Sequence, residues 1–548
     1  MKNDSHTKRR RRLLLISSAL LPLILIFSLI FLKPQMRAQE ATAPTREESA
    51  RTDADPTPQK SAPLSLSNAP ADVELQRKID EVIATSGLDS ARWGVFVQSL
   101  RDGRALYGRE ASKLFVPASN MKVYTTAVAL DLLGTDYRWR TSVYAAREPD
   151  RDGLIDGDLT LYGRGAPDLK LSVKGSRSSL GELADELYRR GVRRVRGGVI
   201  GDESYFRGEP LGDGWLWNDV QWYFGAEVSA LSIGGNEVSL TLAPAGKVGD
   251  SASLKLEPET DYVRVVNDAQ TAESGQPTTM GINRGLSDNV FRVWGEFPLR
   301  SSGFRARLAV HQPALWAAQL FRAELRARGI TVEGEARTKD ARVTRESERF
   351  DPQSAVELAH LDSRTLGETA HEVNKESLNL EAELILRTLG KERGATAPSN
   401  DPRRMLTRGD DEAGLAVVRR WLETAGIRTA GLGLHDGSGL SRLDLVTPEA
   451  TVRLLAAIRQ SRAAQSFLDS LPIAGRDGTL RSRLRAASGR IRAKTGTLAT
   501  INSLSGYVET DGGETLAFSI ICNDETTPSS SIPVIDSIAR LLAAYRQK

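Results

Sequence analysis

Three short segments, far apart in the chain, carry side chains that could together acylate a serine. They are Ser119-Asn120-Met121-Lys122, Ser377-Leu378-Asn379 and Lys494-Thr495-Gly496-Thr497. A serine hydroxyl is a weak nucleophile at neutral pH and needs an adjacent base. Together the three segments supply a nucleophile, a base, a proton relay and a cation for a carboxylate. This set predicts a serine hydrolase.

The first segment has the context that a nucleophile of this kind requires. Pro117 fits the first turn of a helix, and the apolar residues that follow Met121 predict that this helix is buried. Ser119 and Lys122 then lie three residues apart on one face. Lys122 can act as the base only if burial and neighbouring positive charge lower its pKa. The helix N-terminus also favours negative charge that develops near Ser119.

The middle segment has a rival. Ser287-Asp288-Asn289 is followed by an alternating stretch typical of a strand, so we interpret it as a hairpin turn, where these residue types are common. Ser377 instead precedes an apolar stripe at helical spacing that ends at Gly390. The helical context favours Ser377 and Asn379 as the functional pair.

Composition narrows the function classes. The chain has 548 residues, enough for two or three domains, and a net charge of +4. The first 33 residues alone carry seven Lys or Arg and one Asp, so the remainder is slightly acidic and gives no nucleic-acid footprint. The single cysteine, Cys522, excludes an intramolecular disulfide. The five histidines form no metal-binding pattern, and we expect no metal or cofactor.

The N-terminus has the pattern of a membrane anchor. A basic run at Lys8–Arg12 precedes 20 uncharged residues from Leu13 to Leu32, a length that spans a bilayer. We expect residues 1–33 to be an uncleaved anchor in the cytoplasmic membrane, with the rest of the chain in the periplasm or outside the cell. Residues 34–71, rich in Pro, Ala, Ser and Thr, predict a disordered tether. The alternative is a signal peptide cleaved near Ala43, which leaves a soluble periplasmic form.

The rest of the chain predicts an α/β (α+β) fold with an insertion. Hairpin turns at Asp102-Gly103 and Asp511-Gly512-Gly513 lie near the two ends of the globular part. They suggest one antiparallel sheet that is built from both ends and flanked by helices. Residues 140–337 are rich in short strands with only two clear helices, near 180–190 and 313–328. We therefore expect a catalytic domain at 72–139 and 338–548, and a β-rich inserted domain at 140–337.

Further segments carry a family resemblance. The trio of motifs is shared by β-lactamases and penicillin-binding proteins. The blocks Asp436-Gly437-Ser438-Gly439-Leu440-Ser441-Arg442 and Gly475-Arg476-Asp477-Gly478-Thr479-Leu480 extend the likeness. The chain resembles the low-molecular-mass penicillin-binding proteins of the D-alanyl-D-alanine carboxypeptidase/endopeptidase type with a large insertion, the peptidase S13 family. It departs from that pattern at Leu378, where the family usually has Asp.

The resemblance implies a penicillin-binding, β-lactamase-like transpeptidase domain and a role for each motif residue. Ser119 would attack a D-Ala-D-Ala carbonyl in a peptidoglycan stem peptide, and Lys122 would take its proton. Ser377 would relay a proton to the leaving D-alanine, and Asn379 would orient Lys122. The substrate-binding residues implied are Lys494, Thr495, Gly496 and Thr497. Turn-forming or supporting roles are implied for Asp436, Ser438 and Asp477.

The family's substrates define the expected partners and the alternatives. The resemblance implies cleavage of D-Ala-D-Ala stem peptides and acylation by β-lactam antibiotics, and it leaves DD-endopeptidase activity open. A β-lactamase or an esterase would use the same residues, and differs mainly in how fast the acyl-enzyme hydrolyses. A catalytically silent scaffold that binds the cell wall is a third reading, and the complete set of motif residues argues against it.

Overall fold

The computed structural model describes residues 65–172, 177–340, 342, 349–394, 409–527 and 530–547. The expected membrane anchor and most of the expected tether lie outside these residues. Two features precede the expected domain start at Asp72: Leu66 forms a bridge with Ala105, and the first helix begins at Pro70. In the described part of the chain, no helix is both long enough and apolar enough to cross a bilayer.

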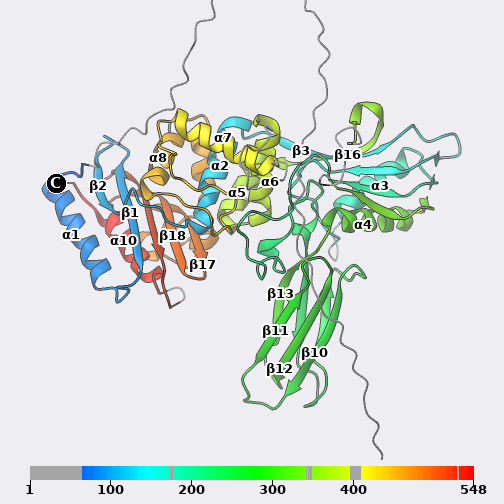
Figure 1. Ribbon diagram of the computed structural model, residues 1–548, viewed down its shortest axis with the longest axis horizontal. Helices are drawn as coiled ribbons and strands as arrows, with labels where there is room; N and C mark the ends of the chain where they lie inside the picture. Colours follow the sequence, from blue (N-terminus) through cyan, green and yellow to red (C-terminus); the bar gives the residue numbers. More distant parts are fainter. Residues whose placement is uncertain are drawn as a thin grey trace, which may run out of the picture. The chain divides into compact units, whose positions relative to one another are not determined.

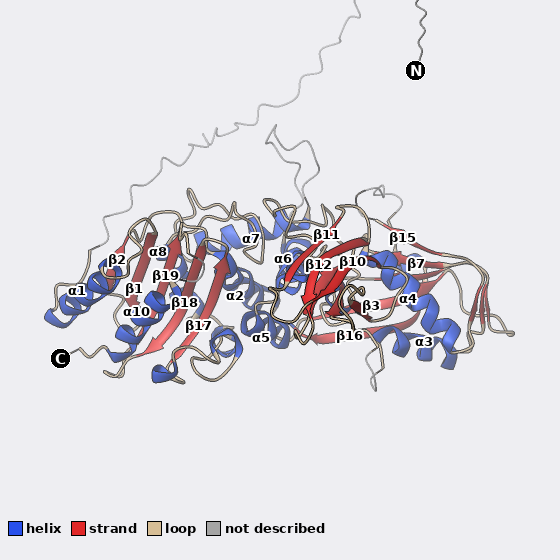
Figure 2. Cartoon of the chain, turned by 90° about the horizontal axis from the view of Figure 1, so that it is seen from below, coloured by secondary structure: helices blue, strands red, loops and turns tan. Residues whose placement is uncertain are grey.

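An antiparallel sheet built from both ends of the described chain carries the third motif (Figure 2). Its strand order is β17-β18-β19-β1-β2, and the strands are β1 (Arg92–Ser99), β2 (Ala105–Arg109), β17 (Ile491–Leu498), β18 (Ile501–Glu509) and β19 (Thr515–Asn523). The β1–β2 and β18–β19 hairpins confirm the two predicted turns. β1 pairs with β19, so the hairpins join into one sheet, as predicted.

Helices pack on both faces of this sheet. Val95 and Val97 join one apolar cluster and Phe96 another, because successive strand residues point to opposite faces. α1 (Pro70–Ala84) and α10 (Ile532–Ala544) cover the first face, and α8 (Pro448–Ile458) packs on β1 and β19 from the second. The other helices of this part are α2 (Met121–Leu133), α5 (Leu366–Glu376), α6 (Asn379–Arg393), α7 (Asp410–Thr424) and α9 (Ala464–Ser470).

A strand-rich insertion follows α2 (Figure 1). Its largest sheet has the order β15-β7-β5-β3-β16, with β3 (Arg138–Ala145), β5 (Leu159–Tyr162), β7 (Val199–Asp202), β15 (Ala336–Lys339) and β16 (Val356–Thr365). Two three-stranded sheets contain β8 (Glu237–Ala243), β9 (Ser253–Glu257), β10 (Arg264–Ala272), β11 (Thr279–Arg284), β12 (Val290–Pro298) and β13 (Phe304–Ala309). A small sheet contains β4 (Leu154–Ile155), β6 (Arg194–Val195) and β14 (Thr331–Val332). The helices α3 (Ser179–Arg189) and α4 (Pro313–Ala327) confirm the two that were predicted.

Strand pairing bears on the limits of the insertion. β3 and β16 pair with each other, and β3 also pairs with β5 inside the insertion's largest sheet. We therefore propose limits of 138 and 365 in place of 140 and 337. The sequence marks turns between strands, but it does not reveal which sheet a strand joins, so β16 was assigned to the catalytic part.

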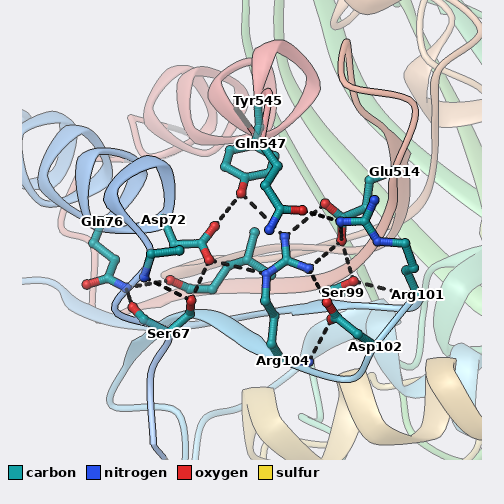
Figure 3. A network of polar contacts seen from close by, with 12 residues as sticks. Ser67, Asp72, Gln76, Ser99, Arg101, Asp102, Arg104, Glu514, Tyr545 and Gln547 are labelled. Atoms are coloured by element: carbon teal, nitrogen blue, oxygen red, sulfur yellow. Dashed lines mark hydrogen bonds and ion pairs between the residues drawn. The ribbon is translucent and has the colours of Figure 1, made fainter.

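A buried ionic network ties the first and last elements of the described chain together (Figure 3). Arg104, just before β2, donates to both carboxylate oxygens of Glu514, at 2.8 and 2.9 Å, and to Asp72 of α1 at 3.2 Å. The Tyr545 hydroxyl, just after α10, donates to the other oxygen of Asp72. Because both carboxylates are almost fully buried, each depends on these partners. The network therefore fixes α1 and the end of α10 at the sheet edge opposite β17.

Candidate active site

Ser119 lies where a short 3-10 turn runs into a buried helix. The turn covers Ala118–Asn120 and continues directly into α2. A Cβ atom on Gly496 of β17 would lie 3.0 Å from the Ser119 nitrogen and 2.8 Å from the Pro117 oxygen. Glycine at this position of the third motif therefore lets β17 approach the backbone that carries the nucleophile.

Lys122 is fully buried one turn along α2 and holds three polar partners. Its Nζ lies 3.0 Å from Ser119 Oγ, 2.6 Å from Asn379 Oδ1 and 2.6 Å from the carbonyl oxygen of Ser438. Burial lowers the pKa of Lys122 to about 8, against the charges of Asp436 and Glu383, which raise it. A lysine whose pKa is close to neutral can act as a base towards the serine that it contacts.

A second serine–lysine pair faces the first. Ser377 ends α5 in the left-handed region, with φ 62°, and its Oγ accepts a hydrogen bond from Lys494 Nζ at 2.9 Å. Lys494 also donates to the carbonyl oxygen of Thr495 at 2.7 Å. Burial, and then the positive charge of Lys122, hold the pKa of Lys494 well below its ordinary value. The structure thus brings together the two serines, the two lysines and Asn379 of the three motifs.

The structure separates the two candidates for the middle motif. Ser287 lies in the turn between the paired strands β11 and β12, which confirms the hairpin interpretation. Leu378 occupies the N-cap position of α6 and makes no side-chain cap, whereas an Asp there could accept an N–H of the first turn. Leu378 packs against the apolar core instead, and its two neighbours keep their contacts with Lys494 and Lys122.

The remaining residues of the third motif lie along β17. The Thr495 hydroxyl donates to the Thr479 hydroxyl at 2.8 Å, inside the block that resembles G-x-DGTL. Thr497 is exposed near the end of the strand and donates to Asn502 Oδ1 at 2.9 Å. Their roles in binding a substrate stay predictions.

The three residues expected to play supporting roles lie around the site in different ways. Ser438 contacts Lys122 through its main-chain carbonyl and not through its hydroxyl. Asp436 is buried and accepts a hydrogen bond from the Trp215 indole at 2.9 Å. Asp477 binds the ammonium of Lys375, two residues before Ser377, at 2.9 and 2.8 Å. These contacts hold the loops that surround the serines in place.

The insertion contributes to the site as well. The Asn379 side-chain amide donates to the carbonyl oxygen of Phe224 at 2.8 Å, so its Oδ1 faces Lys122. Trp215, in the same stretch of the insertion, reaches Asp436. Neither Phe224 nor Trp215 stands out in the sequence as a site residue. A main-chain carbonyl leaves no signal in residue type, and the tryptophan-rich stretch from 215 to 222 was the only available clue.

In the described part of the chain, no group of three or more His, Cys, Asp or Glu side chains is placed to hold a metal ion. Cys522 is buried in β19, where burial raises the pKa of its thiol to about 12.

The chain matches a known family of peptidases. The model of the D-Ala-D-Ala carboxypeptidase 3 (S13) family matches residues 75–545. The chain belongs to this family. It is 36% identical over 487 residues to the D-alanyl-D-alanine carboxypeptidase of Actinomadura sp. (strain R39), which covers 86% of this chain and 85% of that protein. It is 26% identical over 439 residues to the D-alanyl-D-alanine carboxypeptidase DacB of Haemophilus influenzae. That alignment covers 79% of this chain and 86% of the DacB chain. The S13 resemblance inferred from the sequence is confirmed.

A solved structure supports the fold of this S13 chain. The crystal structure of penicillin binding protein 4 from Haemophilus influenzae matches with a TM-score of 0.72 at 23% identity, over 85% of this chain and 99% of that one. The match confirms the predicted penicillin-binding fold class, with its antiparallel sheet and flanking helices.

Substitutions in the middle motif test which serine is functional. Ser377→Ala and Asn379→Ala should each slow acylation of Ser119 by about 10²-fold, because each removes a group positioned for proton transfer or for orienting the base. Single-turnover kinetics with a chromogenic thioester measure this rate. Ser287→Ala is the matched control and should leave the rate unchanged. A damaging Ser287→Ala with a neutral Ser377→Ala would reverse the assignment.

Proposed function

We propose that this S13 protein is a serine-type D-Ala-D-Ala carboxypeptidase that acts on peptidoglycan stem peptides through an acyl-enzyme at Ser119. The observation that carries the proposal is the contact between the half-buried Ser119 hydroxyl and the fully buried Lys122 amine at 3.0 Å. The S13 match and the carboxypeptidase relatives support the substrate class.

The reaction follows from the positions of the two serine–lysine pairs. Neutral Lys122 takes the proton of Ser119 as the serine oxygen attacks the carbonyl carbon of the penultimate D-alanine. The carbonyl oxygen becomes an oxyanion, and backbone N–H groups of Ser119 and Thr497 are proposed to stabilise it, at roughly 2.7–4 kcal/mol per donor. The C–N bond then breaks, and the proton that Lys122 took from Ser119 reaches the leaving amine through the hydroxyl of Ser377. Water attacks the resulting ester and releases the shortened peptide.

Lys494 is the proposed partner of the substrate's terminal carboxylate. In the free protein, burial and Lys122 hold its pKa well below the ordinary value. A bound carboxylate would raise that pKa again, so binding should take up a proton. Binding is then tightest below the free-state pKa of Lys494 and weakens as the pH rises above it. The proposed role of this amine is therefore recognition of the carboxylate.

The same residues would support a β-lactamase or an esterase, so the product decides between the functions. A carboxypeptidase releases free D-alanine from a purified muropeptide that ends in D-Ala-D-Ala. Release of D-alanine that disappears with Ser119→Ala would support the proposed activity. Rapid penicillin turnover without D-alanine release would support the β-lactamase alternative.

We also propose that the protein is anchored to the cytoplasmic membrane by residues 13–32, because this stretch carries no charge over a length that spans a bilayer. The full chain should then stay in the membrane fraction after a high-salt wash. N-terminal sequencing that finds the mature chain starting near Ala43 would favour a cleaved signal instead.

Ser119 should carry the covalent adduct of a labelled penicillin. The expectation rests on its contact with Lys122 and on its place at the start of α2. Mass spectrometry of the proteolytic peptides should find the adduct on the peptide that contains Ser119. Labelling that persists in Ser119→Ala would contradict the acyl-enzyme proposal.

Replacing Lys494 separates carboxylate recognition from chemistry. The charge-assisted bond to the carboxylate should contribute about 1.5–3 kcal/mol, so Lys494→Ala should lower kcat/KM for D-Ala-D-Ala peptides by about 10- to 150-fold. A neutral thioester should lose much less. Comparison of kcat/KM for both substrates in both proteins measures the difference. Equal losses would place Lys494 in the chemistry alone.

A further inference from the structure

Neutral Lys122 has fewer N–H groups than acceptors around it. Its Nζ contacts Ser119 Oγ, Asn379 Oδ1 and the carbonyl oxygen of Ser438. A neutral amine has two N–H groups and one lone pair, and the two carbonyl oxygens can only accept. They therefore take both N–H groups and leave the lone pair facing Ser119. The Ser438 carbonyl, together with Asn379, decides whether the base points at the nucleophile.

The Ser438 carbonyl belongs to a turn that a buried carboxylate holds from behind. Glu383 Oε1 accepts the main-chain N–H of Ser438 at 2.8 Å and that of Gly437 at 3.0 Å. Glu383 is only 2% exposed. On the other side of the same turn, the Thr125 hydroxyl of α2 donates to the carbonyl oxygen of Gly437 at 2.7 Å. Burial and the charge of Asp436 raise the pKa of Glu383 to about 8, but its Oε1 can accept both N–H groups whether the carboxyl is charged or neutral, so Glu383 anchors this turn.

Glu383 and Asn379 lie one turn apart in α6 and therefore on the same face. Side chains of α6 thus position both oxygens that accept a hydrogen bond from Lys122. Asn379 supplies one of them, and Glu383 holds the turn that carries the other, the Ser438 carbonyl. We propose that Glu383 is a positioning residue for the general base. By holding the 437–438 turn, it keeps the Ser438 carbonyl within hydrogen-bonding distance of Lys122, so that the lone pair of Lys122 points towards Ser119. The inference rests on the role that the proposed function gives to Lys122.

Charge near Lys122 provides a second readout. The carboxyl groups whose charge raises its pKa are Glu381 and Glu383 on α6 and Asp436 and Asp444 on the loop before α8, while the amine of Lys494 faces it from β17. Burial raises the pKa of Glu381 to about 7 and that of Glu383 to about 8, so both groups act as charges only at the high-pH end of the profile. The base acts in its neutral form, so the acylation rate rises with pH through the pKa of Lys122. Removing a nearby negative charge lowers that pKa and moves the acid limb of the profile to lower pH.

Two substitutions of Glu383 separate the effect of its side-chain length from the effect of its charge. Glu383→Asp keeps the charge but shortens the side chain by one methylene, so the acylation rate at the high-pH plateau should fall by about 10- to 100-fold, as a displacement of about 1 Å can cause. Its acid limb should stay in place. Glu383→Gln should also lower the plateau, because the amide that replaces Oε2 would face the Gly437 N–H that Oε2 accepts at 3.1 Å, and it should move the acid limb to lower pH.

The matched control is Glu381→Gln. Glu381 lies on the same helix and also raises the pKa of Lys122, but the N–H groups of the 437–438 turn bond to Glu383. This control should move the acid limb without lowering the plateau by more than about twofold. Thr125→Val is an independent test, because it loosens the same turn from α2 without changing any charge. It should slow acylation and leave the acid limb unmoved.

The measurements are the pH profile of acylation by a labelled penicillin, its non-covalent affinity, and the final fraction of protein labelled. The inference predicts slow but complete labelling of the Glu383 variants with unchanged affinity. A plateau within twofold of wild type in both Glu383 variants would overturn it, and so would an equal plateau loss in Glu381→Gln. Incomplete labelling marks a folding defect in a variant. In that case the acylation rate of Thr125→Val decides whether the 437–438 turn positions Lys122. Labelling of Ser119→Ala would instead overturn the proposed function, so the two failures are distinguishable.

Discussion

The site depends on the burial of two lysine amines beside two serine hydroxyls. Lys122 and Lys494 are both fully buried, and removal from water disfavours the charged form of each. Similar protein contacts replace the hydrogen bonds to water at both amines. Each amine contacts one serine hydroxyl and one main-chain carbonyl. A pKa lowered in this way lets an amine give and take protons near neutral pH. Burial therefore produces the chemistry, and the rest of the fold has to keep water out and the partners in place.

Keeping the partners in place requires close approach between parts of the chain that are far apart in sequence. β17 reaches the backbone at Ser119 only because Gly496 has no side chain. β17 is an edge strand of a sheet whose opposite edge is fixed by the buried ionic network around Arg104. The antiparallel register between these edges sets where Lys494 lies relative to α2. A sheet built from both ends of the described chain thus holds β17, with the third motif, next to Ser119.

Residue types predicted which side chains meet at the candidate site, but not what holds them. The motifs located Ser119 and Lys122 because a candidate nucleophile and its base must be particular side chains at helical spacing. The turn at Ser287 could be set aside because its local chemistry differs from that of a helix start. The Ser438 and Phe224 carbonyls were not predictable, because any residue can supply a carbonyl and only the fold decides where it points. The paired strands β3 and β16 were likewise missed, since pairing over a long sequence separation leaves no local pattern.

The insertion helps to position the candidate site, because its two connections lead to α2 and α5, the helices next to Ser119 and Ser377. α2 leads through Tyr137 into β3, and β16 leads directly into α5, which ends at Ser377. β3 and β16 pair antiparallel, and the N–H of Leu366 donates to the Tyr137 carbonyl at 2.8 Å where the two connections meet. The base of the insertion therefore acts as a clamp that fixes α2 relative to α5. The insertion then returns to the site, where the Phe224 carbonyl fixes the amide of Asn379. A change of strand register at the clamp would move Ser119 relative to Ser377, so the geometry of catalysis constrains the insertion as tightly as it constrains the motifs themselves.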